Sequence, residues 1–302
     1  MRKYLLIILL LLAQVLLPGM LPAQTRLPDY HPALLPNPLV GIGVNARVSQ
    51  SSEGYFIYNY EIYNPRANNG RITNVYLGIP RGVGDATMKS DGLKTECYIP
   101  KDIMAAVTPV GMEKPPHWDC GVGTHQMAGW SSSDHPYDIV PGQSLSGMVL
   151  TSYGLPGIRN VKVLPLIVET VYPSIEEYDV DMDELRKVQD QDEERVSFYG
   201  RTIGPTAPPA VFKTVEFLDY IIDLKHQAAS LGWIDNAGIV TSLDVKLDNA
   251  KKKLSQGDNN TARNILGAFI NEVEAQAGKH LTSEAYALLK YNAAYIMSNL
   301  PK

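Results

Sequence analysis

The chain has 302 residues, of which 45% are hydrophobic and 20% are charged. This apolar content excludes a mainly disordered chain, and a total of two cysteines excludes a small scaffold held together by many disulfides. The formal net charge of −5 gives no overall attraction to polyanions, so we expect no nucleic-acid partner.

The first residues have the layout of a secretory signal peptide. Arg2 and Lys3 are followed by an almost unbroken apolar run over 4–17, which is short of the ~20 residues that span a bilayer. A proline and a glycine end the run, and Ala23 is the small residue at the expected cleavage point. We predict a signal peptide over 1–23, a secreted or periplasmic protein, and no membrane span after cleavage. An uncleaved anchor is the alternative.

Short alternating segments come next and predict β-strands. Apolar residues occupy every second position in 40–48, and 55–63 and 72–79 continue this pattern between turn-forming residues. Further strands are expected at 95–99, 127–130, 145–151, 161–169 and 196–203. Short strands separated by glycine and proline turns predict an antiparallel β-sandwich over 24–203.

One short segment carries a resemblance to a known fold. The string Ile139-Val-Pro-Gly-Gln-Ser-Leu-Ser-Gly147 resembles the turn followed by a strand that is common in bacterial immunoglobulin-like domains. This resemblance implies that the sandwich is immunoglobulin-like.

The two cysteines, Cys97 and Cys120, are 23 positions apart. In an oxidising compartment two such thiols are expected to pair, and closing this loop would stabilise the fold by about 3 kcal/mol. A lone catalytic thiol is the alternative, and it would need a neighbouring base. We therefore expect a disulfide.

Polar side chains that could bind zinc gather near the second cysteine. The predicted ligands are His117, Asp119, His125 and His135. Their spacing matches no named zinc motif, and a disulfide would remove the Cys120 thiolate as a further ligand. The alternative is a loop that happens to be rich in histidine.

Aromatic side chains in the same stretch suggest a second kind of site. Exposed rings stack on sugars, so Trp118, Trp130 and Tyr137 could form a glycan-binding face. Aromatic residues also favour strands and pack across sheets, which is the competing interpretation.

Residues 175–196 form an acidic insert with ten acidic and three basic residues. Asp179, Asp181 and Asp183 stand at alternate positions, which suits calcium. Glu184 stands where an EF-hand loop needs glycine. A solvated acidic stretch that includes a short exposed helix is therefore the alternative.

A proline-rich linker over 204–210 precedes a change to helical periodicity. From 211 onward, apolar residues recur at every third or fourth position. Each predicted helix has a glycine at its end or a capping side chain at its start. The caps are Asp235 or Asn236, Asp258 or Asn259, and Thr282, and the terminating glycines are Gly232, Gly257 and Gly278. The pattern predicts a small four-helix module over 211–302.

Two strings in this module resemble a known family. They are Gly238-Ile-Val-Thr-Ser-Leu-Asp-Val-Lys-Leu-Asp-Asn-Ala-Lys-Lys-Lys-Leu-Ser-Gln-Gly257 and Ala262-Arg-Asn-Ile-Leu-Gly-Ala-Phe-Ile270. Both resemble the FIMAH-type helical domain of secreted bacterial surface proteins and enzymes, and the likeness extends over 238–300. It departs at Asn271–Glu274, where the histidine of the family name would be expected. The resemblance implies an accessory, non-catalytic module.

Familiar catalytic signatures are missing from the sequence, including a nucleophile elbow, a His-Glu-x-x-His helix and a phosphate-binding loop. We therefore expect an exported, non-catalytic bacterial protein that binds an unknown protein or glycan of the cell envelope. We expect no cofactor beyond the zinc or calcium considered above. The alternatives are a metal-dependent hydrolase using residues 117–138 and a purely structural component of the envelope.

Overall fold

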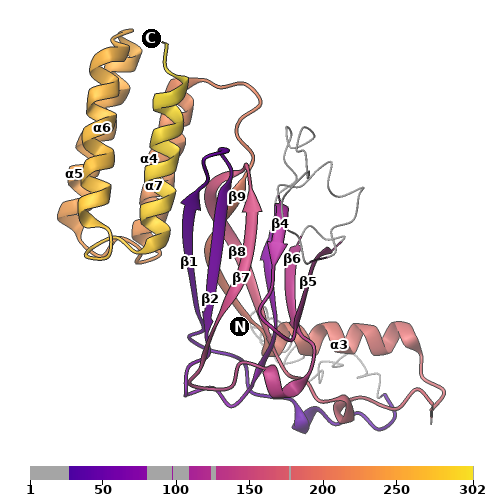
Figure 1. The fold of residues 1–302 in the computed structure, drawn as a ribbon. Helices are drawn as coiled ribbons and strands as arrows, with labels where there is room; N and C mark the ends of the chain where they lie inside the picture. Colours follow the sequence, from indigo (N-terminus) through magenta and orange to yellow (C-terminus); the bar gives the residue numbers. More distant parts are fainter. Residues whose placement is uncertain (1–26, 80–96, 98–108, 124–126, 177, 302) are drawn as a thin grey trace, which may run out of the picture. The chain divides into compact units, whose positions relative to one another are not determined.

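The computed structural model describes residues 27–79, 97, 109–123, 127–176 and 178–301 (Figure 1). The predicted signal peptide over 1–23 lies outside the described residues. The chain divides into two compact units. The larger unit comprises Pro36–Leu166 and Arg195–Lys302, and the smaller unit comprises Ile167–Glu194 and the described part of Met1–Leu35.

The larger unit begins with two antiparallel β-sheets. The first sheet has the order β1-β2-β7-β4, with β1 (Gly43–Gln50), β2 (Phe56–Tyr63), β7 (Ser144–Ser152) and β4 (Pro109–Glu113). The second has the order β5-β6-β3-β8-β9, with β5 (Trp118–Gly123), β6 (Met127–Ser132), β3 (Ile72–Gly78), β8 (Leu155–Pro165) and β9 (Phe198–Thr206). Successive side chains of a strand point to opposite faces, and β2 accordingly alternates between buried and more exposed residues.

The strand order is that of an immunoglobulin-like sandwich. In that fold, strands A, B, E and D form one sheet, and C, F and G form the other. Here β1, β2, β7 and β4 take the places of A, B, E and D, and β3, β8 and β9 take those of C, F and G. The β5–β6 hairpin is added to the free edge of β3. The predicted antiparallel, immunoglobulin-like sandwich is therefore confirmed.

The prediction was wrong in the stretch before β6. The sequence pattern gave no strand over 109–123, whereas β4 and β5 lie there. Both strands are short and rich in glycine or proline, so their own residues favour strand weakly, and pairing with β7 and β6 defines them. The strand expected at 95–99 lies outside the described residues, except for Cys97. The strand expected at 161–169 ends earlier, at Pro165.

Helices fill the rest of the larger unit: α4 (Thr214–Ser230), α5 (Ala237–Ser255), α6 (Asn259–Gln276) and α7 (Ser283–Asn299). The predicted caps are confirmed. Side-chain oxygens of Asn236, Asp258 and Thr282 accept hydrogen bonds from backbone N–H groups in the first turns of α5, α6 and α7. The three predicted glycines have φ between +70° and +75°, a conformation that ends a helix at little cost for glycine. β9 runs to Thr206, so the strand overlaps the predicted linker over 204–210.

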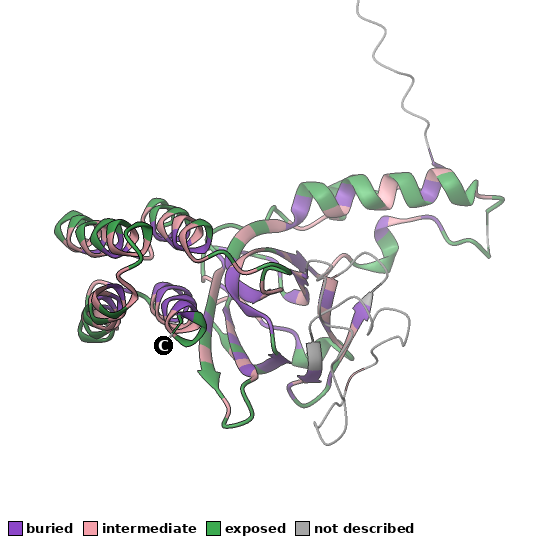
Figure 2. Ribbon diagram, turned by 90° about the horizontal axis from the view of Figure 1, so that it is seen from above, coloured by how far each residue is buried: buried purple, intermediate pink, exposed green. Residues whose placement is uncertain are grey.

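Helix α7 packs against the sandwich as well as against its neighbouring helices. The buried Glu284 side chain accepts a hydrogen bond from the Ala46 amide of β1 at 2.6 Å. The buried Asn292 side chain donates to the Pro156 carbonyl of β8 at 2.8 Å. Figure 2 shows buried residues along α7, and one continuous hydrophobic cluster includes residues of both sheets and all four helices α4–α7. Because β1 is a sheet edge, α7 satisfies backbone groups that would otherwise be open to other strands.

The smaller unit is built around α3 (Met182–Val196), whose last two residues belong to the larger unit. The Tyr30 hydroxyl donates to both carboxylate oxygens of Asp192, at 2.9 and 2.8 Å, and the Tyr30 ring stacks on Tyr172. The His31 amide donates to the Val171 carbonyl at 2.9 Å. Most of α3 is exposed (Figure 2). None of the helices in the described part of the chain combines the length and apolar character needed to cross a membrane.

Candidate functional site

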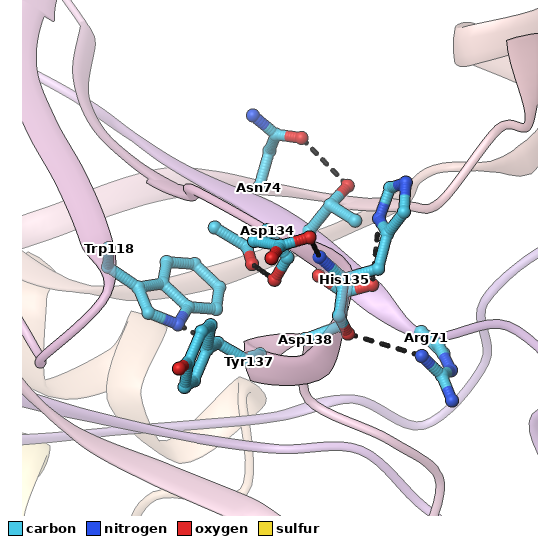
Figure 3. A network of polar contacts seen from close by, with 9 residues as sticks. Arg71, Asn74, Trp118, Asp134, His135, Tyr137 and Asp138 are labelled. Atoms are coloured by element: carbon cyan, nitrogen blue, oxygen red, sulfur yellow. Dashed lines mark hydrogen bonds and ion pairs between the residues drawn. The ribbon is translucent and has the colours of Figure 1, made fainter.

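The described residues that the sequence predicted to bind zinc or glycan lie close together in the chain, at and between β5 and the short 3-10 helix η3 (His135–Tyr137). β5, β6 and η3 carry them, and Figure 3 shows the contacts between them. We refer to the described residues of 117–138 and their partner Arg71 as the η3 network.

Trp118 and Trp130 are structural residues of the sandwich. Each is only 1% exposed. The Trp118 indole N–H donates to the Tyr137 carbonyl at 3.1 Å (Figure 3), and the Trp130 indole N–H donates to the Glu113 carbonyl at 2.9 Å. The prediction that these two rings present a glycan-binding face is therefore corrected, because packing across the sheet has buried them.

Tyr137, the third ring of that prediction, remains partly open to solvent. It is 41% exposed and stacks on the His117 ring with centroids 3.8 Å apart and planes 9° apart. His117 has a φ of +63° because it lies in the tight turn between β4 and β5. The turn places the imidazole over the phenol, so one face of each ring is covered by the other.

Asp119 is held by two neighbours on the surface. Its carboxylate accepts from Lys114 Nζ at 2.8 Å and from the Ser133 hydroxyl at 3.0 Å. The hydrogen bond from Lys114, the hydrogen bond from Ser133 and the charge of Lys114 lower the pKa of Asp119 below its ordinary value. Asp119 is therefore a charged, exposed partner of Lys114, which is unlike the raised pKa of a general acid.

His135 and Asp138 hold η3 against the sheet. The Asp138 side chain is fully buried, and His135 Nδ1 lies 3.4 Å from one of its oxygens. Arg71, the residue directly before β3, donates a hydrogen bond to the His135 carbonyl at 3.1 Å. The Asp134 carboxylate accepts a hydrogen bond from the His135 amide at 2.8 Å (Figure 3). Within the described residues, neither Asp138 oxygen has a hydrogen-bond partner, and the His135 ring is a polar group that lies beside this carboxylate.

The zinc prediction gains no support from these positions. His117 stacks on a ring, Asp119 pairs with Lys114, and His135 faces Asp138. Among the described residues, no three His, Cys, Asp or Glu side chains gather as a metal-binding group. His125 lies outside the described residues.

The residues predicted to bind calcium lie at and before the start of α3. Asp181 caps α3, because its side-chain oxygen accepts from the amides of Asp183 at 2.9 Å and Glu184 at 3.3 Å. Asp183 lies 3.8 Å from Arg186 on the same helix, and Asp179 is exposed before it. Asp181 therefore lies at a helix start, and the calcium interpretation gains no support from these contacts.

The predicted disulfide is confirmed. Cys97 and Cys120 are bonded, with Cα atoms 4.9 Å apart. Cys120 lies on β5, at the edge of the second sheet, and Cys97 lies in the long connection between β3 and β4. The bond therefore fastens that connection to the edge strand.

A cleft in the smaller unit was missed by the sequence analysis. Leu34, Ile175 and Met182 are 51%, 60% and 50% exposed and line a cleft of about 950 Å³. Part of this cleft could have been suspected from the sequence, because Ile175 and Met182 are large apolar residues inside the acidic insert, where a solvated segment needs none.

Comparisons with known proteins agree with the helical part and add little for the sandwich. No curated protein matches the chain. Among solved structures, the chain is similar to a protein from Nocardia farcinica whose crystal structure is described as an immunoglobulin-like fold. The identity is 11%, the TM-score is 0.26, and the match covers 40% of this chain and 76% of that one. The family model of the FIMAH domain matches residues 218–298, so the C-terminal helices are similar to that domain, as the sequence resemblance implied.

Proposed function

We propose that this protein is an exported, non-catalytic interaction protein of the bacterial cell envelope or its surroundings. The observation that supports the non-catalytic part of the proposal is that side chains of the η3 network form contacts that stabilise the fold. Its rings, imidazoles and carboxylates are used to hold η3, β5 and β6 together, as described above. These contacts stabilise the scaffold, and within the described residues they engage the side chains that the sequence offered as zinc ligands.

Two further features support export and an accessory role. Disulfides persist mainly in oxidising compartments, and Cys97 is bonded to Cys120. The match of residues 218–298 to the FIMAH domain agrees with a module that accompanies other surface proteins.

The packing of α7 on β1 and β8 gives the sandwich and the helices a defined mutual arrangement within the larger unit.

Export is tested by expressing the full chain and a version that lacks residues 1–23 in a bacterium with an oxidising periplasm. We expect the full chain outside the cytoplasm, beginning at Gln24 and with Cys97 oxidised, and the shortened chain inside. An uncut full chain that stays in the cytoplasm would contradict the proposal.

The non-catalytic part is tested by loading the purified protein with zinc, followed by dialysis and elemental analysis. We expect far less than one zinc per chain, and the same value in a His117→Ala/His135→Ala variant. One zinc per chain that this variant loses would replace the proposal with the metal-dependent hydrolase.

A further inference from the structure

We propose that the cleft beside α3 binds a basic amphipathic segment of a partner protein. The inference rests on the proposed function as an interaction protein and names the chemistry of the partner. The cleft lies entirely within the smaller unit, and we refer to it as the α3 cleft.

The apolar part of the α3 cleft comes from three separate segments. Leu34 ends the first 3-10 turn η1 (Pro32–Leu34), Ile175 follows the 3-10 turn η4 (Glu169–Val171), and Met182 begins α3. Each side chain is at least half exposed, although residues of this kind usually fill a core. Their convergence on one hollow of about 950 Å³ makes an apolar floor that a partner's apolar side chains can cover.

The rim of the α3 cleft is acidic. Asp29, Glu169 and Glu176 line it, and all three are exposed. The acidic insert continues this charge, with ten acidic and three basic residues over 175–196. Among the lining residues, His31 is the one whose side chain can carry a positive charge, and its Nε2 lies 2.9 Å from a carboxylate oxygen of Asp29. An apolar floor with an acidic rim is complementary to a helix or strand with apolar residues on one face and lysine or arginine beside them.

The α3 cleft is held in shape before any partner binds. Tyr30 donates to both oxygens of Asp192, its ring stacks on Tyr172, and the His31 amide donates to Val171. These contacts join α3 to the segment that carries Leu34, and join that segment to the one that carries Ile175. A preformed cleft lowers the entropic cost of binding.

The same charge argues against two other occupants. A second copy of the chain would bring one acidic rim against another, and like charges across an interface oppose association. An anionic lipid surface would be repelled for the same reason. A basic protein segment is the occupant for which both the floor and the rim are favourable.

The probe is a fluorescently labelled synthetic peptide of leucine and lysine, patterned as an amphipathic helix, and binding to the full mature chain is followed by anisotropy. We expect saturable binding that weakens as salt rises, because added ions screen the acidic rim. An Ile175→Asp/Met182→Asp variant should weaken binding by about tenfold, because the apolar floor is lost although negative charge is gained. Both residues are exposed, so the variant should fold as the parent does.

The matched control is Val211→Asp/Val245→Asp, which adds the same charge at exposed apolar positions of the larger unit, 72% and 54% exposed. It should bind the peptide at least as tightly as the parent. A second pair compares Glu169→Lys/Glu176→Lys at the rim with Glu53→Lys/Glu216→Lys elsewhere, and only the first should weaken binding severalfold.

Three outcomes would overturn the inference: equal weakening in the cleft variant and its control, equal binding of a leucine–glutamate peptide, or sedimentation showing a dimer that the cleft variant dissociates. None of these bears on export or zinc content, so the inference and the proposed function can fail separately.

Discussion

Helices α3 and α7 are similar in length, 15 and 17 residues, but they have opposite surroundings. α7 buries residues toward both the other helices and the sandwich, including the polar Glu284 and Asn292. α3 buries little beyond Leu185, Asp192 and Val196. The difference separates two uses of a helix. Burial with specific polar contacts fixes α7 in the scaffold, whereas Met182 at the start of α3 is half exposed to solvent.

The largest expected effect comes from a core truncation in α7. Leu288 is fully buried, so Leu288→Ala should lower the free energy of unfolding by about 2–5 kcal/mol. Met182→Ala, at the exposed start of α3, should change it by less than about 0.5 kcal/mol. Urea unfolding followed by circular dichroism gives both values.

Hydrogen exchange on the Leu288→Ala variant adds a test of the scaffold. Because one hydrophobic cluster includes residues of both the sandwich and α4–α7, exchange should increase in β2 and α5 together. Loss of protection in α5 with β2 unchanged would mean that the sandwich and the helices unfold separately. In that case α7 would not hold the two parts together as one scaffold.

Removing the disulfide should have the next largest effect. Cys97→Ser/Cys120→Ser releases a loop of 23 positions and should cost about 3 kcal/mol of stability. The parent protein under reducing conditions should show the same loss. Because both cysteines belong to the larger unit, exchange protection of α3 at low denaturant should be unchanged. A loss confined to α3 would contradict the division into two units.

A smaller effect is expected at the contact between α7 and β1. Glu284→Ala removes the acceptor of the Ala46 amide and should cost about 1–3 kcal/mol, since the amide is left buried without its partner. The control is Glu216→Ala. Glu216 also lies in the first turn of a helix, so the interaction with the helix dipole is similar, but its partner is the exposed Lys213. Equal thermal shifts in the two variants would show that the Ala46 contact contributes nothing.

The same contrast explains how much of the fold could be predicted from the sequence. The caps at Asn236 and Thr282 and the glycine at Gly257 act within a few residues of themselves, so local pattern was sufficient to place α5–α7. β4 and β5 could not be placed in this way, because Pro109, Gly111 and Gly121 favour turns. They become strands by pairing with β7 and β6, which local pattern does not reveal.

The candidate sites were predicted less well because residue type does not report burial. Trp118 and Trp130 suggested a sugar-binding face, but cross-strand packing buries them. Asp181 suggested a cation ligand, but its oxygen caps a helix. The α3 cleft joins Leu34 to Met182 across more than a hundred positions, and only the folded chain brings them together.

The smallest expected effect distinguishes two helix caps of the same geometry. Asn236 accepts from the second and third amides of α5 at 2.8 and 3.2 Å, and Asp181 accepts from those of α3 at 2.9 and 3.3 Å. Replacing either residue with alanine removes about 1 kcal/mol of helix stability. In α5 this cost should appear in global unfolding, because Leu243 and Leu247 tie the helix to the core. In α3 it should appear as faster exchange of the first-turn amides with an unchanged urea midpoint, since a helix with few buried contacts can fray alone. An equal drop in the urea midpoint for both variants would mean that α3 is as firmly built into the fold as α5, and the contrast between an exposed and a buried helix would fail.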